Sequence, residues 1–341
     1  MNTAQINQVK KITILHNIDT SFLYGEEDIL VEKEYQDDIN SIRQVFDSSG
    51  FQTELYEVDE NTFDGISDIK TDFFFNLSYG IGSVPKTEDK IPKLLATTGI
   101  PYSGATAEGL LLTTDKALTK KVFQENGIPT PRYQLFENPN TKIDKSLTFP
   151  LFVKPVAEDC SVGIDNNSIV ENQRQLKERI NLVLSTYKQP ALVEKYINTR
   201  EFRIPMIGNG EDITILPISE LVFGPSFTKN NLWKIDDFET KFVKESIKYK
   251  DTNIVCPAKL DPEIEREIKE FSLLAYRKIG ARDYARIDIR LDEGNSPYFL
   301  EVNMNPGLGL EDTMITSAKA AGYTYDSFIL KLLNIALSRS N

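Results

Sequence analysis

Apolar residues near the start of the chain fall into short buried runs separated by a helical stripe. Residues 11–16 (KITILH) form an apolar run typical of a buried strand, and residues 34–49 carry apolar side chains at helical spacing. Residues 51–57 alternate as a strand does, and residues 72–77 (DFFFNL) form a second apolar run. This strand–helix–strand order predicts a parallel α/β unit at the N-terminus.

The same patterns continue through the rest of the chain. Helices are predicted over residues 88–98, 114–126, 172–186, 261–279 and 325–338. Strands are predicted over residues 150–154, 191–197, 284–291 and 297–303, with two more between 200 and 224. The stretch 225–256 is polar and long, so we predict a loop there that is functional or mobile. Gly99 and Pro101 end the first unit, which places a domain boundary near residue 104.

The composition is that of an ordinary globular protein. The chain has 341 residues, 40% of them hydrophobic, which is enough for two or three domains. Its net charge of −12 argues against a protein that follows nucleic-acid phosphates, although a local pocket can still be basic. No apolar run is long enough for a membrane span and the first residues lack a signal-peptide core, so we expect a cytoplasmic protein.

Histidine and cysteine are too scarce for several kinds of catalytic site. His16 is the only histidine, which argues strongly against a Ser-His-Asp triad or a histidine-rich metal site. Cys160 and Cys256 lie far apart and form no CxxC pair, which favours a reducing compartment and no zinc site. Because no histidine is near Cys160 in the sequence, we interpret it as a small loop residue and not as a nucleophile.

The strongest local signal lies in the predicted C-terminal hairpin. Arg286 and Asp288 share one face of its first strand, and Glu301 and Asn303 share one face of its second. If the strands pair, three oxygen ligands and a guanidinium meet on one surface, a set that suits Mg²⁺ together with phosphate oxygens. On these residues alone, an exposed strand face with ordinary ion pairs is an equally good interpretation.

Two lysines occupy positions that suit an anionic ligand. Lys154 ends an apolar strand, and the following loop 156–164 contains Ser161, so charge and backbone N–H groups are available for phosphates. Lys116 lies in the first turn of a helix, where a cation opposes the helix dipole unless it serves an anion. Taken singly, Lys154 is a weak signal because surface lysines at strand ends are common, and Lys116 is better explained as a solvated surface charge. The strand end 194–197 is, by itself, better explained as a strand leaving the core.

The order of these residues resembles that of the D-alanine–D-alanine ligases of the ATP-grasp class. The supporting strings are GIPYSGATAEGLLLTTDKALTKKVFQENGIPTP (99–131), FPLFVKPVAEDCSVGI (149–164), ALVEKYINTREF (191–202), DFETKF (237–242), ARIDIRLDE (285–293) and FLEVNMNPG (299–307). Several motifs in one order are much more specific than any one of them. The resemblance implies an ATP-grasp fold, α/β (α+β) in class, and ATP-dependent carbon–nitrogen ligation.

The resemblance also implies three domains. An N-terminal parallel-sheet domain for substrate binding would cover residues 1–104, and a central ATP-grasp subdomain would cover residues 105–190. A C-terminal ATP-grasp domain over residues 191–341 would carry the Mg²⁺ site, with ATP gripped between the central and C-terminal domains.

Individual roles follow from the same resemblance. Lys116 and Lys154 would contact ATP phosphates, and Lys241, in the stretch 225–256, would reach the γ-phosphate. Arg286 would stabilise the tetrahedral intermediate, and Ser161 would belong to a mobile loop that covers the phosphates. The other implied residues are Glu194, Lys195 and Ile197 at the adenine, Glu201 at the ribose, and Asp288, Glu301 and Asn303 as ligands of two Mg²⁺ ions.

The N-terminal substrate-binding motifs of the family are altered in this sequence. The family's histidine-glycine motif is absent from residues 76–90 (NLSYGIGSVPKTEDK). Residues 16–35 replace its glycine-rich strand exit and its substrate-binding glutamate, for which Glu32 and Glu34 are the candidate substitutes.

The second substrate-binding motif is altered as well. After Gly307, Asp312 stands near the position of a serine that is expected to hold a substrate carboxylate, and an aspartate there favours a cation or a hydroxyl. We therefore predict that the substrates are not two D-alanines. Among relatives of this type, the sequence resembles the ligases of mycosporine-like amino acid biosynthesis (shinorine or porphyra type), which join serine or threonine to mycosporine-glycine.

Three alternatives stay open: a D-alanine–D-alanine ligase, an L-amino acid dipeptide ligase, and a non-catalytic ATP-binding regulator. In each case the partners are small molecules, and we expect neither nucleic-acid nor membrane binding. Family members are often dimers through the N-terminal domain, so a homodimer is a candidate state, although no apolar stripe in the sequence marks an interface.

Overall fold

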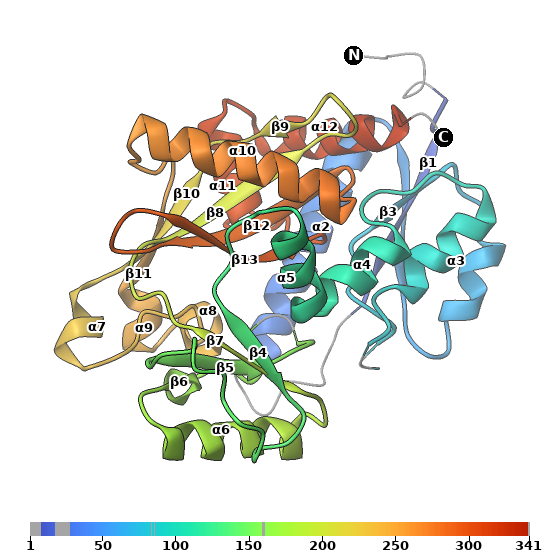
Figure 1. The fold of residues 1–341 in the computed structure, drawn as a ribbon. Coiled ribbons are helices and arrows are strands. Elements are labelled where there is room, and N and C mark those ends of the chain that lie inside the picture. The colour runs from blue at the N-terminus through green and yellow to red at the C-terminus, as the bar shows by residue number, and fades with distance from the viewer. Residues whose placement is uncertain (1–7, 18–27, 83, 85, 159–160, 340–341) are drawn as a thin grey trace.

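Three β-sheets with helices around them form the frame of the computed structural model (Figure 1). The structure describes residues 8–17, 28–82, 84, 86–158 and 161–339, with the backbone alone for residues 28–34. Cys160 and the side chains of Glu32 and Glu34 therefore lie outside the described part of the chain.

The N-terminal sheet is parallel, as predicted. Its strands are β1 (Lys11–His16), β2 (Gln52–Glu57) and β3 (Phe73–Asn76), in the order β2-β1-β3. The helix α2 (Asp28–Ser48) connects β1 to β2, and the apolar residues on its stripe are buried against the sheet. The parallel unit predicted from the strand–helix–strand order is confirmed.

The central sheet is antiparallel and has one helix on its face. Its strands are β4 (Tyr133–Phe136), β5 (Leu151–Pro155), β6 (Ile169–Val170) and β7 (Ala191–Lys195), in the order β4-β7-β5-β6. Helix α6 (Gln173–Thr186) buries Leu176, Ile180 and Val183 in the same core as these strands. Although β7 follows the predicted boundary at residue 190, it pairs within this sheet, and the division into domains stays a prediction.

The C-terminal sheet is the largest of the three. Its strands are β8 (Glu201–Ile207), β9 (Thr214–Ile215), β10 (Ser219–Phe223), β11 (Thr252–Val255), β12 (Tyr284–Leu291) and β13 (Pro297–Asn303). They pair in the order β11-β10-β8-β12-β13, with β9 beside β8, and every pair is antiparallel. The predicted hairpin of β12 and β13 is present with the predicted bounds.

Outside residues 225–256, the described part of the chain contains six further helices and two 3₁₀ turns. The helices are α3 (Lys90–Thr98), α4 (Ala107–Thr114), α5 (Lys116–Glu125), α10 (Pro262–Ile279), α11 (Thr313–Ala320) and α12 (Tyr325–Leu337), and the turns are η1 (Phe63–Asp68) and η2 (Asn166–Ser168). Sequence analysis missed α4 and α11, because two turns of helix are too short to establish an apolar period.

The prediction of a loop over residues 225–256 is wrong in part. This segment contains α7 (Pro225–Lys229), α8 (Phe238–Phe242), α9 (Ile247–Lys250) and β11. Side-chain caps begin the last two of these helices, because Asp237 accepts from the N–H of Thr240 and Ser246 accepts from the N–H of Tyr249. Helices of four or five residues leave no periodic pattern, so only the tertiary structure reveals them.

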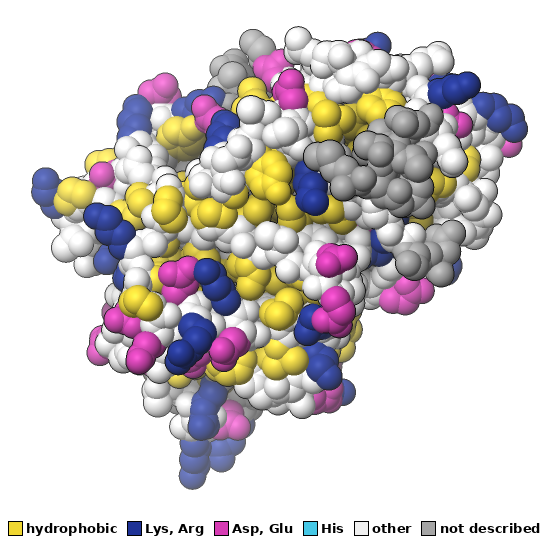
Figure 2. Space-filling view, turned by 90° about the horizontal axis from the view of Figure 1, so that it is seen from above, with side chains coloured by type: hydrophobic (Ala, Val, Ile, Leu, Met, Phe, Trp, Pro, Cys, Tyr) yellow, Lys and Arg dark blue, Asp and Glu magenta, His cyan; other side chains and the backbone are white. Residues whose placement is uncertain are grey.

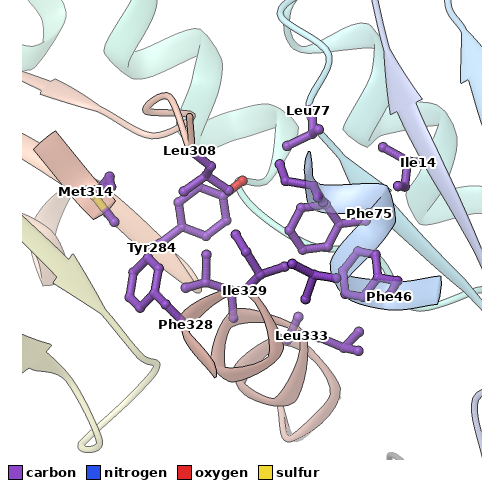
Figure 3. Close-up of a cluster of buried hydrophobic side chains, with 14 of the residues drawn as sticks. Ile14, Phe46, Phe75, Leu77, Tyr284, Leu308, Met314, Phe328, Ile329 and Leu333 are labelled. Carbon is purple, nitrogen blue, oxygen red and sulfur yellow. The ribbon is translucent and has the colours of Figure 1, made fainter. Parts of the chain in front are cut away.

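The last helix packs against the first sheet. Figure 3 shows Phe328, Ile329 and Leu333 of α12 beside Phe46 of α2 and Phe75 of β3, and all five side chains are fully buried. Burying several side chains of this size contributes about 1.5–3 kcal/mol each. The two ends of the chain therefore share one hydrophobic core, which holds the N-terminal sheet beside the C-terminal one.

Charged side chains of both signs lie on the face of the molecule that is seen from above. Figure 2 shows lysine, arginine and acidic side chains intermixed there with apolar ones. None of the helices in the described part of the chain combines the length and the apolar character that crossing a lipid bilayer requires.

The buried histidine of β1 predicts how stability depends on pH. Burial lowers the pKa of His16, and its Nδ1 atom has no hydrogen-bond partner among the described residues. Because the unfolded chain binds a proton that the folded chain does not, the free energy of unfolding should fall as pH drops below about 6.5, by up to about 1.4 kcal/mol per pH unit. Urea denaturation at several pH values, with His16→Gln as the comparison, measures this slope. An equal slope in both proteins would contradict the prediction.

Candidate active site

One face of the C-terminal sheet is apolar and the opposite face is polar. Phe202 and Ile204 of β8 lie in the hydrophobic core that also contains the buried residues of α10. The alternate side chains lie on the other face, where Arg203 is directly opposite Asp288, and Asp288 is directly opposite Glu301. A row of three charged residues therefore crosses three neighbouring strands.

Arg286 and Asp288 form a bidentate ion pair on this polar face. The Nε and Nη2 atoms of Arg286 each lie 2.8 Å from one carboxylate oxygen of Asp288. Burial alone would lower the pKa of Arg286, but nearby carboxylates, with Asp288 first, raise it above its ordinary value. Since Asp288 is buried and Asn303 lies directly opposite Arg286, the alternative of an exposed strand face is wrong.

Glu301 lies among cations that come from separate segments of the chain. Its Oε2 atom is 3.8 Å from the Nζ atom of Lys116, at the start of α5. Burial alone would raise the pKa of Glu301, but four nearby cations lower it to about 2, so its carboxylate is ionised at neutral pH. These cations are Lys116, Lys154, Lys241 and Arg286.

The oxygen donors around Glu301 form a sparse set. Within the described residues, no three side chains of histidine, cysteine, aspartate and glutamate gather as a metal-binding group. The predicted metal ligands contain two carboxylates, Asp288 and Glu301, and the amide of Asn303, whose Oδ1 accepts from the N–H of Asn305 at 3.0 Å. Such a set suits a hard cation that takes most of its ligands from phosphate and water.

Glu194 is buried between two lysines, one of which the sequence analysis missed. Its carboxylate oxygens lie 2.9 Å from the Nζ atom of Lys154 and 2.7 Å from that of Lys120. Burial alone would raise the pKa of Glu194, but the two lysines lower it. Lys120 also donates to the hydroxyl of Thr130, so two contacts hold its ammonium group. Lys120 lies one turn after Lys116 on α5, and that spacing was the available signal.

The strand end after Glu194 is tied to the C-terminal sheet by Arg290. This arginine donates to the carbonyl of Ile197 at 2.6 Å and from Nε to Glu201 at 2.9 Å, and it stacks 5.2 Å from the ring centre of Tyr196. Sequence analysis selected Ile197 and Glu201 but not the arginine that joins them. Lys195, two residues before Ile197, lines the same cavity as Ile197 and Glu201.

The loop after β5 is tied to the segment after β10. The hydroxyl of Ser161 donates to the carbonyl of Asp236 at 2.7 Å, and Ser161 adopts a φ of +63°, which is uncommon for a residue with a side chain. Gly163 has a φ of +73°, and a Cβ atom there would lie 2.8 Å from Pro155, so this position requires glycine. The two segments are therefore in direct contact.

Asp236 and Arg203 form a buried ion pair that sequence analysis did not select. Asp236 also lies 3.4 Å from the Nζ atom of Lys241, and Arg203 donates from Nη1 to the hydroxyl of Thr313 at 3.0 Å. Burial alone would raise the pKa of Asp236, but Lys241 and Arg203 lower it. The signal for Arg203 was its spacing, because it stands two residues after Glu201 and therefore on the same strand face.

The turn before α11 places Asp312 against the backbone. Its Oδ2 atom accepts from the N–H of Gly309 at 2.7 Å, and burial raises the pKa of Asp312. A Cβ atom on Gly307 would lie 2.3 Å from the same oxygen, so the glycine leaves the space that the carboxylate fills.

Apart from Glu32 and Glu34, whose side chains are not described, the residues predicted for nucleotide, metal, substrate or catalysis line one cavity of about 1890 Å³. They are Lys116, Lys154, Ser161, Glu194, Lys195, Ile197, Glu201, Lys241, Arg286, Asp288, Glu301, Asn303, Gly307 and Asp312. A site for one small ligand typically has about 300–1,000 Å³, so this cavity has room for two. It extends to Asn17 and Tyr79, beside the N-terminal sheet.

Comparison with known proteins identifies the family. The family model described as "D-ala D-ala ligase C-terminus" matches residues 122–334, which is more than half of the chain. The chain belongs to the D-alanine–D-alanine ligase family. It is an ATP-dependent carbon–nitrogen ligase of this type, and the family resemblance and the ligase activity inferred from the sequence are confirmed.

Individual relatives agree with this family. The chain is 33% identical over 266 residues to an uncharacterized protein of Sinorhizobium fredii, covering 78% of this chain and 74% of the relative. It is 28% identical over 249 residues to a D-alanine–D-alanine ligase of Cupriavidus necator, covering 72% and 71%. The structure of the D-alanine–D-alanine ligase of Bacillus anthracis complexed with ATP aligns with a TM-score of 0.73 at 21% identity, covering 96% and 97%. The ATP-grasp fold predicted for the chain is therefore confirmed.

The buried carboxylate between the two lysines gives a prediction about stability. Glu194→Gln leaves two buried ammonium groups without their counter-charge, and we expect a loss of about 3–5 kcal/mol in the free energy of unfolding. The matched control is Glu178→Gln, which removes an exposed partner of Arg174 and should leave the denaturation midpoint nearly unchanged. Urea denaturation of both variants measures the difference. Equal midpoints would show that Glu194 does not hold the lysines in the folded protein.

Proposed function

We propose that this ligase uses ATP to phosphorylate an oxygen of an acid or vinylogous acid and then joins the activated carbon to the amine of an amino acid. The observation that carries the proposal is the group of cations from separate segments around Glu301, inside a cavity with room for ATP and a second ligand. Ammonium and guanidinium groups at close range are the partners that phosphate oxygens require.

In this proposal the lysines hold the triphosphate. Lys116, Lys154 and Lys241 neutralise the phosphates while the γ-phosphoryl group leaves ADP and bonds to the acceptor oxygen. The amine nitrogen then attacks the activated carbon, the amine loses a proton, and inorganic phosphate leaves with the former acceptor oxygen. Arg286 faces the oxygen of the tetrahedral intermediate, on which negative charge develops during the attack. Contact between the Ser161 loop and the segment after β10 excludes water, which would otherwise hydrolyse the phosphorylated intermediate.

The donor set of the hairpin fits Mg²⁺. Its three side chains offer only oxygen donors to a metal, and the lowered pKa of Glu301 keeps that carboxylate ionised. Asp288, Glu301 and Asn303 would therefore hold one or two Mg²⁺ ions beside the phosphates. Bound there, the metal would supply charge neutralisation for phosphoryl transfer.

For the second substrate we propose serine or threonine, joined to mycosporine-glycine. The support is the resemblance of the sequence to ligases with that activity, together with Asp312 at a position where a hydroxyl would hold a substrate carboxylate. An aspartate there repels a carboxylate and accepts hydrogen bonds from hydroxyl or ammonium groups, which a polyhydroxylated ring offers.

D-Alanine is the second candidate, and the names of several relatives support it. Relatives that are 28% identical over about 70% of both chains are D-alanine–D-alanine ligases by name. Their resemblance to this chain gives D-alanine support that is at least as strong as the support for mycosporine-glycine.

Release of ADP from ATP, measured against a panel of substrates, distinguishes these candidates. We expect release with mycosporine-glycine plus serine or threonine, and none with D-alanine alone. Release with D-alanine alone would favour the second candidate, and release with mixed L-amino acids would favour a dipeptide ligase. ATP binding without amine-dependent ADP release from any mixture would contradict the ligase proposal itself.

The metal site gives a second test. Glu301→Ala should lower turnover by about 100-fold or more while the melting temperature stays near that of the wild type, because it removes a cavity side chain and not a core side chain. Glu293→Ala is the control, since Glu293 is exposed in the turn between the same two strands. Turnover of Glu301→Ala at the level of this control would contradict the assignment.

A further inference from the structure

We infer that Arg203 binds the carboxylate of the amino acid that the enzyme ligates. The inference rests on the proposed function in one respect, that an amino acid is a substrate. Arg203 is a specificity-determining residue in this scheme, because a buried guanidinium favours a ligand that carries a carboxylate over an amine that lacks one.

The first support is an unused donor. Arg203 is only 9% exposed, yet its Nε atom has no acceptor among the residues that the structure describes. A buried donor without a partner is costly, and such groups are usually satisfied by a ligand or by water. Arg203 also lines the cavity, so an acceptor brought by a ligand can reach it.

The second support is the way the guanidinium is held. Its Nη1 atom donates to the hydroxyl of Thr313, and its Nη2 atom pairs with Asp236. Asp236 is shared with Lys241, whose Nζ atom lies 3.4 Å from it, so one carboxylate does not cancel the charge of both cations. Two fixed contacts also restrict the rotation of the guanidinium, which lowers the entropy lost when a second carboxylate binds.

The third support is location. Arg203 lies opposite Asp288 in the strand register, and its contact with Thr313 places it at the first residue of α11, directly after Asp312. Asp312 occupies the position where the family resemblance expects a hydroxyl that holds a carboxylate. Because an aspartate cannot do so, a neighbouring guanidinium restores the binding of the same group from a different element of the fold.

Paired substrates that differ only in the carboxylate test the inference. ADP release would be measured with the protein, ATP and mycosporine-glycine as the acceptor. Serine would be compared with ethanolamine, and D-alanine with ethylamine. For Arg203→Gln we expect the KM for the amino acid to rise about 10- to 100-fold, as for the loss of one charge-assisted hydrogen-bond pair. The KM for the carboxylate-free amine and the KM for ATP should stay within about twofold.

Two further variants separate binding from folding. In Arg203→Gln, the buried Asp236 keeps only Lys241 as an ion-pair partner. The double variant Arg203→Gln/Asp236→Asn removes both charges and is therefore measured in parallel. The double variant should also lose the preference for the carboxylate. Arg200→Gln is the matched control, because Arg200 pairs with Glu220 at 2.7 Å on the same sheet but does not line the cavity.

Equilibrium binding keeps the inference testable apart from turnover. Serine, D-alanine and the two amines would be titrated calorimetrically into the protein with a non-hydrolysable ATP analogue. The wild type should bind each amino acid more tightly than the matching amine, and Arg203→Gln should not. Equal losses for amino acid and amine in Arg203→Gln, with normal melting temperatures, would overturn the inference. Absence of amine-dependent ADP release from the wild type would count against the proposed function, and the titration would still decide the role of Arg203.

Discussion

The structure depends on the pairing of buried charges along the wall of one cavity. Glu194 has a lysine on each carboxylate oxygen, and Asp236 lies between a guanidinium and an ammonium group. An isolated charge at these depths would be strongly destabilising, whereas opposite charges in contact make burial tolerable. This constraint explains how lysine and arginine side chains can be buried together along one cavity.

The backbone of the C-terminal sheet makes this arrangement possible. Because side chains alternate across a strand, one sequence of residues supplies both the hydrophobic core under α10 and the charged surface of the cavity. The register then aligns Arg203, Asp288 and Glu301 in one row across β8, β12 and β13. Rigid strands fix the spacing of this row more closely than loops could.

The cavity reaches the N-terminal sheet because the ends of the chain share a core. Packing of α12 on α2 and β3 holds the first sheet beside the C-terminal one, so Asn17 and Tyr79 line the same cavity as the lysines. Asp312, which lines this cavity and departs from the sequence pattern expected for the family, lies in the turn before α11. A change of substrate at this turn is therefore compatible with an unchanged group of cations around Glu301.

The sequence by itself determined the family, the fold class and the β12–β13 hairpin with its polar face, because these depend on local alternation and on the order of motifs. Arg286, Asp288, Glu301 and Asn303 could be placed on one surface from the two-residue repeat of a strand alone. The tertiary structure alone decided which charges meet. Asp236 lies 33 positions from its arginine partner, and the guanidinium that pairs with Glu201 lies 89 positions along the chain. No local pattern encodes a contact at such a separation, since it forms only when distant elements pack together.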